Sequence, residues 1–172
     1  MKLVVADSGP LIGLACTNHI DVLLAIVNEV VIPETVFKEC TSSLGIPGSA
    51  VIADYVATGR IRTAMDQEGS DFDIEGLDHG EALAISLAVS MQVPILVDDA
   101  IGRQVARAKG LNVIGACGIL LAAKQRGLIT DVGTVMDAWK RTIGYFISDS
   151  LQAEVLRRAG EPQRLVEKQD ES

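Results

Sequence analysis

The most constraining feature of this sequence is a repeated arrangement in which a short aliphatic run ends in an acid. Residues 3–6 (LVVA) are followed by Asp7, and residues 95–97 (ILV) are followed by Asp98 and Asp99. A short run that is apolar throughout and bounded by turn-forming residues is typical of a strand buried on both faces of a parallel sheet. In open α/β sheets, ligands bind in the crevice at the carboxyl ends of the strands. We therefore expect these acids to face one crevice.

Apolar runs and helical patterns alternate along the chain. Strands are expected at residues 2–6, 29–32, 61–64, 94–97 and 111–114, with helices between them and again from about residue 128. Only 3% of the residues are aromatic against 48% hydrophobic, so the core should be aliphatic, as suits a parallel sheet covered by helices. We predict an α/β fold, a central parallel sheet flanked by helices on both faces. It should form one domain over residues 1–158, followed by a polar tail at 159–172.

The net charge of −8 limits the classes of function. It counts against a protein that coats nucleic acid without specificity, but not against an enzyme that binds RNA through a local basic rim and metal ions. No apolar run approaches the roughly 20 residues that a bilayer-spanning helix needs, so we expect no membrane contact. The three cysteines, Cys16, Cys40 and Cys117, are scattered, which is typical of small buried residues in a reducing cytoplasm.

The acids at the strand ends also have structural explanations. Asp7 could cap the helix expected to begin near residue 10, although Ser8 could cap it equally well. Asp98 and Asp99 both precede a helix expected from about residue 101. Because one cap needs one side chain, the second of these acids is left without a structural role.

Two further acids lie on expected helices. Glu39 is near the end of its helix, where the helix dipole disfavours a negative charge, and taken alone it suggests a surface acid. Glu81 follows Asp78 by three residues, which fits a capping box. Taken together, however, four carboxylates that converge without basic partners repel one another and need compensation by a cation. Oxygen ligands without His or thiolate favour Mg²⁺ or Mn²⁺, which can activate water for attack on a phosphodiester.

Four segments, in order, resemble the acidic motifs of PIN-domain nucleases. They are residues 4–12 (VVADSGPLI), 32–39 (IPETVFKE), 80–85 (GEALAI) and 96–99 (LVDD), the last followed by a helix and the stretch GLNVIG from Gly110. The resemblance covers about residues 1–128. The remainder, including residues 123–129 (AKQRGLI), is similar to an uncharacterised prokaryotic branch near the VapC-type toxins.

This resemblance implies a PIN-like three-layer sandwich and a Mg²⁺-dependent ribonuclease. Members of this kind are often homodimers, and the toxins among them are often held inactive by a small antitoxin protein. Two features depart from the compact toxins: the chain is longer, and Val97 stands where Thr or Ser usually precedes the last acids.

The resemblance also suggests a role for each acid. Asp7 and Asp99 are expected to ligate the metal directly, with Asp99 aligned to the principal acid of the last motif. Glu81, where many members carry Asp, and Asp98 are expected to complete the shell directly or through water. Glu39 is expected to position or deprotonate the attacking water.

Several other residues are candidates for contacts with RNA. Ser8 could bond a phosphate oxygen or a ligand carboxylate, or simply cap a helix. Arg103 and Arg107 lie one helical turn apart and could meet RNA phosphates, although a solvated helix face explains them as well. The aromatic residues near the C-terminus are interpreted as packing or dimer contacts rather than base-stacking platforms: Trp139, Tyr145 and Phe146.

Three other classes of function compete with a nuclease. A phosphatase that uses Asp7 as its nucleophile needs an acid two residues later, where Gly9 stands. A receiver domain carries its paired acids near its start, whereas Asp98 and Asp99 leave too little chain behind them. A PIN-like module that has lost catalysis and binds RNA or a protein partner stays open as the alternative.

Overall fold

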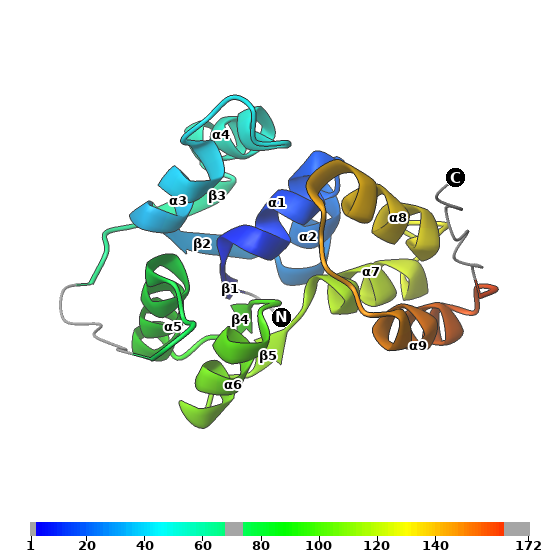
Figure 1. Cartoon of the computed structure of the whole chain (residues 1–172). Coiled ribbons are helices and arrows are strands. Elements are labelled where there is room, and N and C mark those ends of the chain that lie inside the picture. Colours follow the sequence, from blue (N-terminus) through cyan, green and yellow to red (C-terminus); the bar gives the residue numbers. More distant parts are fainter. Residues whose placement is uncertain (1–2, 68–73, 164–172) are drawn as a thin grey trace, which may run out of the picture.

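The strands of the protein form one parallel sheet in the order β3-β2-β1-β4-β5 (Figure 1). The computed structural model describes residues 3–67 and 74–163 of the chain. Its strands are β1 (Leu3–Ala6), β2 (Glu29–Pro33), β3 (Ile61–Ala64), β4 (Ile95–Leu96) and β5 (Val113–Ile114). Every pair of neighbours is parallel, and Val5 pairs with both Val31 and Ile95. The predicted parallel sheet is therefore confirmed.

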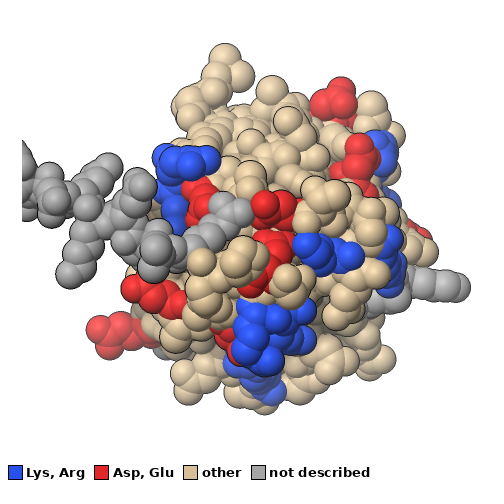
Figure 2. All heavy atoms as spheres, turned by 90° about the vertical axis from the view of Figure 1, so that its right-hand side faces the viewer, with Lys and Arg blue, Asp and Glu red and all other residues tan. Residues whose placement is uncertain are grey.

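Helices cover both faces of this sheet. They are α1 (Ser8–Cys16), α2 (Ile20–Val27), α3 (Glu34–Thr41), α4 (Ser49–Ala57), α5 (His79–Met91), α6 (Ala100–Ala108), α7 (Ala116–Gln125), α8 (Val132–Ile143) and α9 (Asp149–Ala159). The α5–α6 pair lies on one face, α1, α2 and α7 lie on the other, and α8 and α9 pack outside α1 and α7 (Figure 1). The three layers confirm the predicted sandwich. Figure 2 views the molecule from the C-terminal helices and shows Lys and Arg gathered there in several groups.

The order of the strands creates a crevice between β1 and β4. The chain builds outward from β1 to β2 and β3, and then returns to place β4 and β5 on the other side of β1. Ligands bind at such a reversal, because the connections leave the two adjacent strands toward opposite faces. The backbone N–H of Asp7 donates to the Leu96 carbonyl at 2.9 Å, so the ends of the two strands are joined directly.

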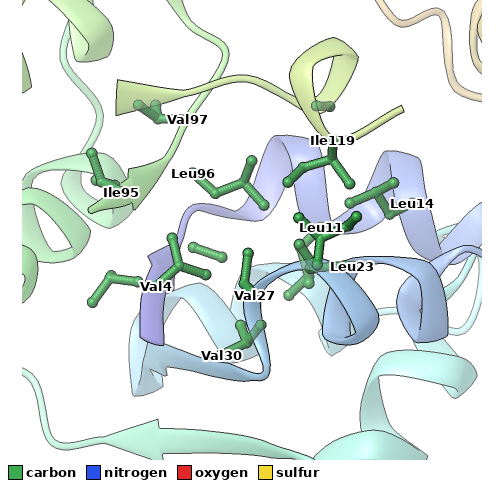
Figure 3. Close-up of a cluster of buried hydrophobic side chains, with 14 of the residues drawn as sticks. Val4, Leu11, Leu14, Leu23, Val27, Val30, Ile95, Leu96, Val97 and Ile119 are labelled. Atoms are coloured by element: carbon green, nitrogen blue, oxygen red, sulfur yellow. The ribbon is translucent and has the colours of Figure 1, made fainter. Parts of the chain in front are cut away.

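The core is aliphatic and lies on both faces of the sheet, against α5 on one face and against α1, α2 and α7 on the other. Figure 3 shows side chains of β1, β2 and β4 meeting those of α1, α2 and α7. Trp139 of α8 is also completely buried, and its indole N–H donates to the Thr17 hydroxyl at 3.1 Å. Its ring centroid lies 5.3 Å from that of Tyr145. The interpretation of Trp139 as a packing residue is therefore confirmed.

Some sequence predictions fall where the structure does not test them. The run of acids from Asp66 to Asp78 also predicts an exposed, mobile loop, but its members Glu68, Asp71 and Asp73 lie outside the described residues, as do residues 164–172 of the predicted polar tail. The division into a domain at 1–158 and a tail stays a prediction. Within the described ranges, no helix is long and apolar enough to cross a membrane.

Candidate active site

Acids from separate parts of the chain line one open cleft at the carboxyl ends of β1 and β4. The cleft has a volume of about 580 Å³. Its acidic residues are Asp7 after β1, Asp78 and Glu81 at the start of α5, and Asp98 and Asp99 after β4. The structure thus brings four of the sequence-predicted acids to one place. Asp78 was predicted only as a helix cap, and it is an additional member of the cluster.

Asp7 is the most deeply buried acid of this cleft. Its residue is 5% exposed, and it stands at the N-cap position of α1 without making a capping hydrogen bond. In the described part of the chain, its Oδ1 is a buried side-chain oxygen with no hydrogen-bond partner. The alternative that Asp7 merely caps α1 is therefore wrong, since a capping side chain accepts from the second or third residue of the helix.

The surroundings of Asp7 disfavour its negative charge. Burial is the largest cause that raises its pKa, from 3.8 to about 7. A hydrogen bond from the Ser8 backbone opposes the shift, and repulsion from three other acids adds to it: Glu81, Asp78 and Glu39. The charge of the Asp7 carboxylate is therefore poorly compensated by the protein alone.

Glu81 combines a structural role with a place in the cleft. The predicted capping box is confirmed: Asp78 Oδ1 accepts from the Glu81 N–H at 2.8 Å, and Glu81 Oε2 accepts from the Asp78 N–H at 3.3 Å. The other carboxylate oxygen, Oε1, faces Gly102 of α6. Burial raises the pKa of Glu81 to about 7, and the negative charges of Asp78, Asp99 and Glu39 contribute.

The two acids after β4 point in different directions. Asp99 Oδ2 caps α6 by accepting from the N–H groups of Ile101 at 2.8 Å and Gly102 at 3.0 Å. Asp98 Oδ1 accepts from the Ala116 N–H at 3.0 Å, and its Oδ2 accepts from the Tyr145 hydroxyl. Among the residues that the structure describes, hydrogen bonds thus engage both oxygens of Asp98 but only one oxygen of Asp99. This arrangement favours Asp99 over Asp98 as the metal ligand. Asp98 instead bonds Ala116 and Tyr145, which is the structural role that the sequence did not reveal.

Glu39 reaches the cluster from α3 rather than lying on the surface. It is half-buried, and a Cβ built on Gly80 would collide with its carboxylate, which therefore lies against the N-terminal turn of α5. The positive end of that helix stabilises a negative charge there. Burial raises the pKa of Glu39, and a hydrogen bond with the Ser8 side chain opposes the rise. The interpretations of Glu39 as a surface acid and of Ser8 as a helix cap are both wrong, since Asp7 occupies the N-cap.

The two arginines after β4 differ in their surroundings. Arg103 donates from Nη1 to the Val97 carbonyl at 3.3 Å and lines a neighbouring cavity, where its charge lowers the pKa of Asp98 against the larger effect of burial. The interpretation of Arg103 as a solvated surface residue is therefore wrong, whereas Arg107 is exposed on α6. Among the described residues, no Lys or Arg lines the acid cleft.

These properties fit a hard divalent cation. The cleft offers carboxylate oxygens, a buried Asp7 oxygen without a partner, and negative charges that no basic side chain in its described lining compensates. Within the described ranges, no three His, Cys, Asp or Glu side chains are yet gathered closely enough to hold one ion. Glu81 and Asp99 each use one oxygen in a helix cap, so a cation would have to draw their remaining oxygens toward Asp7.

Sequence reasoning missed the contribution of Tyr145. Its hydroxyl bonds Asp98, which lies 47 residues earlier in the chain. A tyrosine in a C-terminal segment carries no local signal that identifies a partner at such a separation. Asp78 could have been found, because a capping box already placed it beside Glu81.

Comparison with known proteins gives an independent assignment. A family model of the PIN domain matches the chain over residues 3–161. No curated protein matches it. The match extends beyond the resemblance at residues 1–128 and includes every helix from α1 to α9. The C-terminal helices are therefore part of what the family model describes.

Proposed function

The chain belongs to the PIN-domain family, and from this premise we propose that it is a Mg²⁺- or Mn²⁺-dependent endoribonuclease that hydrolyses RNA phosphodiester bonds. PIN domains are generally nucleases, so membership supports a hydrolase at the level of reaction class. One observation carries the proposal further: within the described residues, the buried Asp7 carboxylate keeps an oxygen without a partner, inside a cleft of further acids.

Three carboxylates are proposed to hold the cation: Asp7, Glu81 and Asp99. Asp98 would join them only by exchanging one of its two hydrogen bonds for the ion. When bound, a divalent cation would neutralise the cluster and withdraw charge from the oxygens of the phosphodiester. The α6 cap and the α5 capping box keep Asp99 and Glu81 on rigid elements, which limits the motion needed to bind.

Glu39 is proposed to accept a proton from the attacking water. Burial raises the pKa of Glu39 toward neutral pH, which makes its carboxylate a better base. The Ser8 side chain and the N-terminal turn of α5 hold the carboxylate on the side of Asp7. Ser8 thus serves as a positioning residue for Glu39 in this proposal.

Gly80→Ala tests the position of Glu39. The new methyl group would displace the Glu39 carboxylate, which is the far end of a flexible side chain. We expect RNA cleavage to fall about tenfold, which is less than the loss expected from removing a general base altogether. We expect the free energy of unfolding to change by less than about 1 kcal/mol, because alanine is favoured over glycine in a helix. Cleavage rates and urea unfolding measure the two effects.

Gly45→Ala in the exposed connection between α3 and α4 is the control, because it makes the same chemical change outside both cavities. Among the described residues, its added Cβ would meet only Ser43 Oγ, at an ordinary 3.4 Å, so the fold and the cleavage rate should both stay unchanged. Equal cleavage by the Gly80 and Gly45 variants would show that the carboxylate of Glu39 has no part in the reaction.

The test of the proposed function is RNA cleavage by purified protein in EDTA, and again after addition of Mg²⁺ or Mn²⁺. The proposal expects no cleavage in EDTA and recovery with either ion. Undiminished cleavage in EDTA, or no cleavage of a mixed set of structured and single-stranded RNAs in Mn²⁺, would contradict it.

A catalytically inactive PIN-like module is the second candidate. It is favoured by the present spacing of the acids, which in the described residues form no group of three able to share an ion. Calorimetric titration with Mn²⁺ separates the candidates. An active enzyme should bind the ion with an affinity that Asp7→Asn greatly reduces, whereas an inactive module should release no heat of binding in either form.

Whether the protein acts as a toxin depends on the proteins with which it associates. We propose that the chain forms a homodimer and, if it is a toxin, pairs with a small antitoxin protein. Light scattering of the purified protein measures the first point. Growth arrest on expression, relieved by co-expression of a small protein encoded next to it, measures the second, and unimpaired growth would favour an RNA-processing role.

A further inference from the structure

A second cavity adjoins the acid cleft. It has a volume of about 560 Å³ and lies between β5, α7, α9 and the connection from α8 to α9. The two cavities share one wall, formed by Asp98, Tyr145, Phe146 and Leu151. A molecule lying in the acid cleft can therefore extend past this wall into the second cavity. Its volume falls within the range of about 300–1,000 Å³ that is common for small-molecule sites.

The lining of this second cavity combines an apolar floor with cations at its edge. The floor consists of Val113, Ile114, Leu121 and Val155, and the cations are Arg103 and the exposed Arg158. Two acids also line the cavity, but both have partners. Glu154 is paired with Arg157 through contacts of 2.8 and 2.9 Å, and Asp98 is held by Ala116 and Tyr145. The cavity thus suits a flat, largely apolar group that carries a negative charge at one side.

The shared wall presents an aromatic ring to solvent. The Phe146 residue is 87% exposed, so it makes little packing contact within the chain. Tyr145, next to it, is fixed by its bond to Asp98 and by ring contact with Trp139. The backbone at residue 146 is therefore anchored while its ring projects beside the cavity. Phe146 therefore does not pack within the chain, the predicted dimer contact stays a prediction, and the exposed ring is also free to stack on a base.

The distribution of charge indicates which side of the molecule a polyanion would contact. Residues 1–115 contain seven Lys and Arg against fifteen Asp and Glu, whereas residues 116–163 contain six against five. Figure 2, which views the side of α8 and α9, shows several groups of Lys and Arg interspersed with Asp and Glu. Since the acid cleft repels phosphate, contacts that hold a nucleic acid are needed outside it, and the second cavity lies on this less acidic side.

We propose that the second cavity is a nucleobase subsite. It takes the base of the nucleotide next to the scissile phosphate, stacked on Phe146, with the phosphate beyond that base beside Arg158. This inference rests on the proposed ribonuclease function, because it assumes that the scissile bond lies in the acid cleft. Stacking on an aromatic side chain tolerates all bases, so the subsite contributes affinity more than sequence preference.

The experiment compares two RNA oligonucleotides in Mn²⁺, one intact and one with an abasic residue beside the cleaved bond. For the wild type, removal of the base should lower kcat/KM about tenfold. Phe146→Ala should lower kcat/KM for intact RNA by a similar factor and leave kcat/KM for abasic RNA unchanged. Leu44→Ala removes an equally exposed apolar side chain, 95% exposed in the α3–α4 connection, and should change neither value.

Binding measurements keep this inference separate from the proposed function. Fluorescence anisotropy of the same oligonucleotides, with Ca²⁺ in place of Mn²⁺, reports the subsite even if the protein cleaves neither RNA. Loss of the base and loss of the Phe146 ring should each weaken binding about tenfold, and together no more than either alone. The subsite proposal is contradicted if Phe146→Ala binds each oligonucleotide as tightly as the wild type does. It is also contradicted if the substitution weakens the binding of both oligonucleotides by the same factor. The exposed ring would then belong to a protein interface.

Discussion

Asp7→Asn is expected to reduce RNA cleavage by about 100-fold or more and, at pH 8 without metal, to make the protein more stable. The loss of activity follows from the central place of Asp7 in the cleft. Even changes to groups that only support a metal ligand reduce activity or metal affinity by about 10–100-fold, and loss of a ligand itself should reach or exceed that range. Cleavage assays in Mn²⁺ measure this part.

The gain in stability follows from the charge. The Asp7 pKa of about 7, against 3.8 for an unperturbed group, corresponds to at most about 4 kcal/mol of destabilisation by the ionised form at pH 8. Asparagine has nearly the same shape but no charge, so we expect a gain of about 1–3 kcal/mol in the free energy of unfolding. Effects of opposite sign on activity and stability are typical of a residue retained for function.

Asp54→Asn is the matched control, because it makes the same chemical change on the exposed surface of α4. It should alter neither cleavage nor stability beyond about 0.5 kcal/mol. If Asp7→Asn instead unfolds more readily than the wild type at pH 8, the carboxylate is a structural group and the proposed metal site loses its central ligand.

Local patterns in the sequence predicted where the strands lie more accurately than how long they are. The apolar runs before Asp7 and Pro33 gave β1 and β2 to within one residue. In contrast, the segments at 94–97 and 111–114 contain strands of only two residues each. The backbone there is still joined, as in the bond of 3.0 Å from the Val97 N–H to the Ile114 carbonyl, but the regular ladder stops. The length of a ladder depends on both strands, and a pattern in one strand does not fix it.

The acid cluster was predictable where acids follow strands, because parallel strands carry their carboxyl ends to one edge. The direction of each side chain was not. Asp98 and Asp99 are adjacent, yet one bonds α7 and Tyr145 whereas the other caps α6. That difference depends on partners up to 47 residues away, and it could only be read from the fold. The exposure of Phe146 could not be predicted from the sequence for the same reason.

The stability of the metal-free protein is expected to fall as the pH rises from about 4 to 8. Asp7 and Glu81 have folded-state pKa values of about 7, above their ordinary 3.8 and 4.5. Between these values the folded protein binds more protons than the unfolded chain, so its stability decreases as protons are lost. Burial also raises the pKa of Glu39 and Asp98, which acts in the same direction. Urea unfolding in EDTA at several pH values measures the decrease, which we expect to be about 2–4 kcal/mol.

Other groups oppose this trend. Burial lowers the pKa of His19 below 6.5, so its contribution to stability rises with pH up to about its ordinary pKa of 6.5. Hydrogen bonds lower the pKa values of Asp21, Asp66 and Glu154, which makes stability rise with pH at the acidic end of the window. Asp21 and Glu154 are exposed and Asp66 is only partly buried, so we expect the buried acids of the cleft to dominate. Mn²⁺ at pH 8 should restore the lost stability, because a cation that binds only the folded protein compensates the ionised carboxylates and adds its own binding free energy.

Asp7→Asn is the decisive comparison for this pH dependence. Without the Asp7 carboxylate, the decrease between pH 4 and 8 should shrink by about half, and the stabilisation by Mn²⁺ should largely disappear. A wild-type stability that rises steadily through this window, or a Mn²⁺ effect of equal size in both proteins, would mean that the acids of the cleft carry no uncompensated charge. Since that charge is the physical reason to expect a cation, the nuclease mechanism would then have no support from the structure.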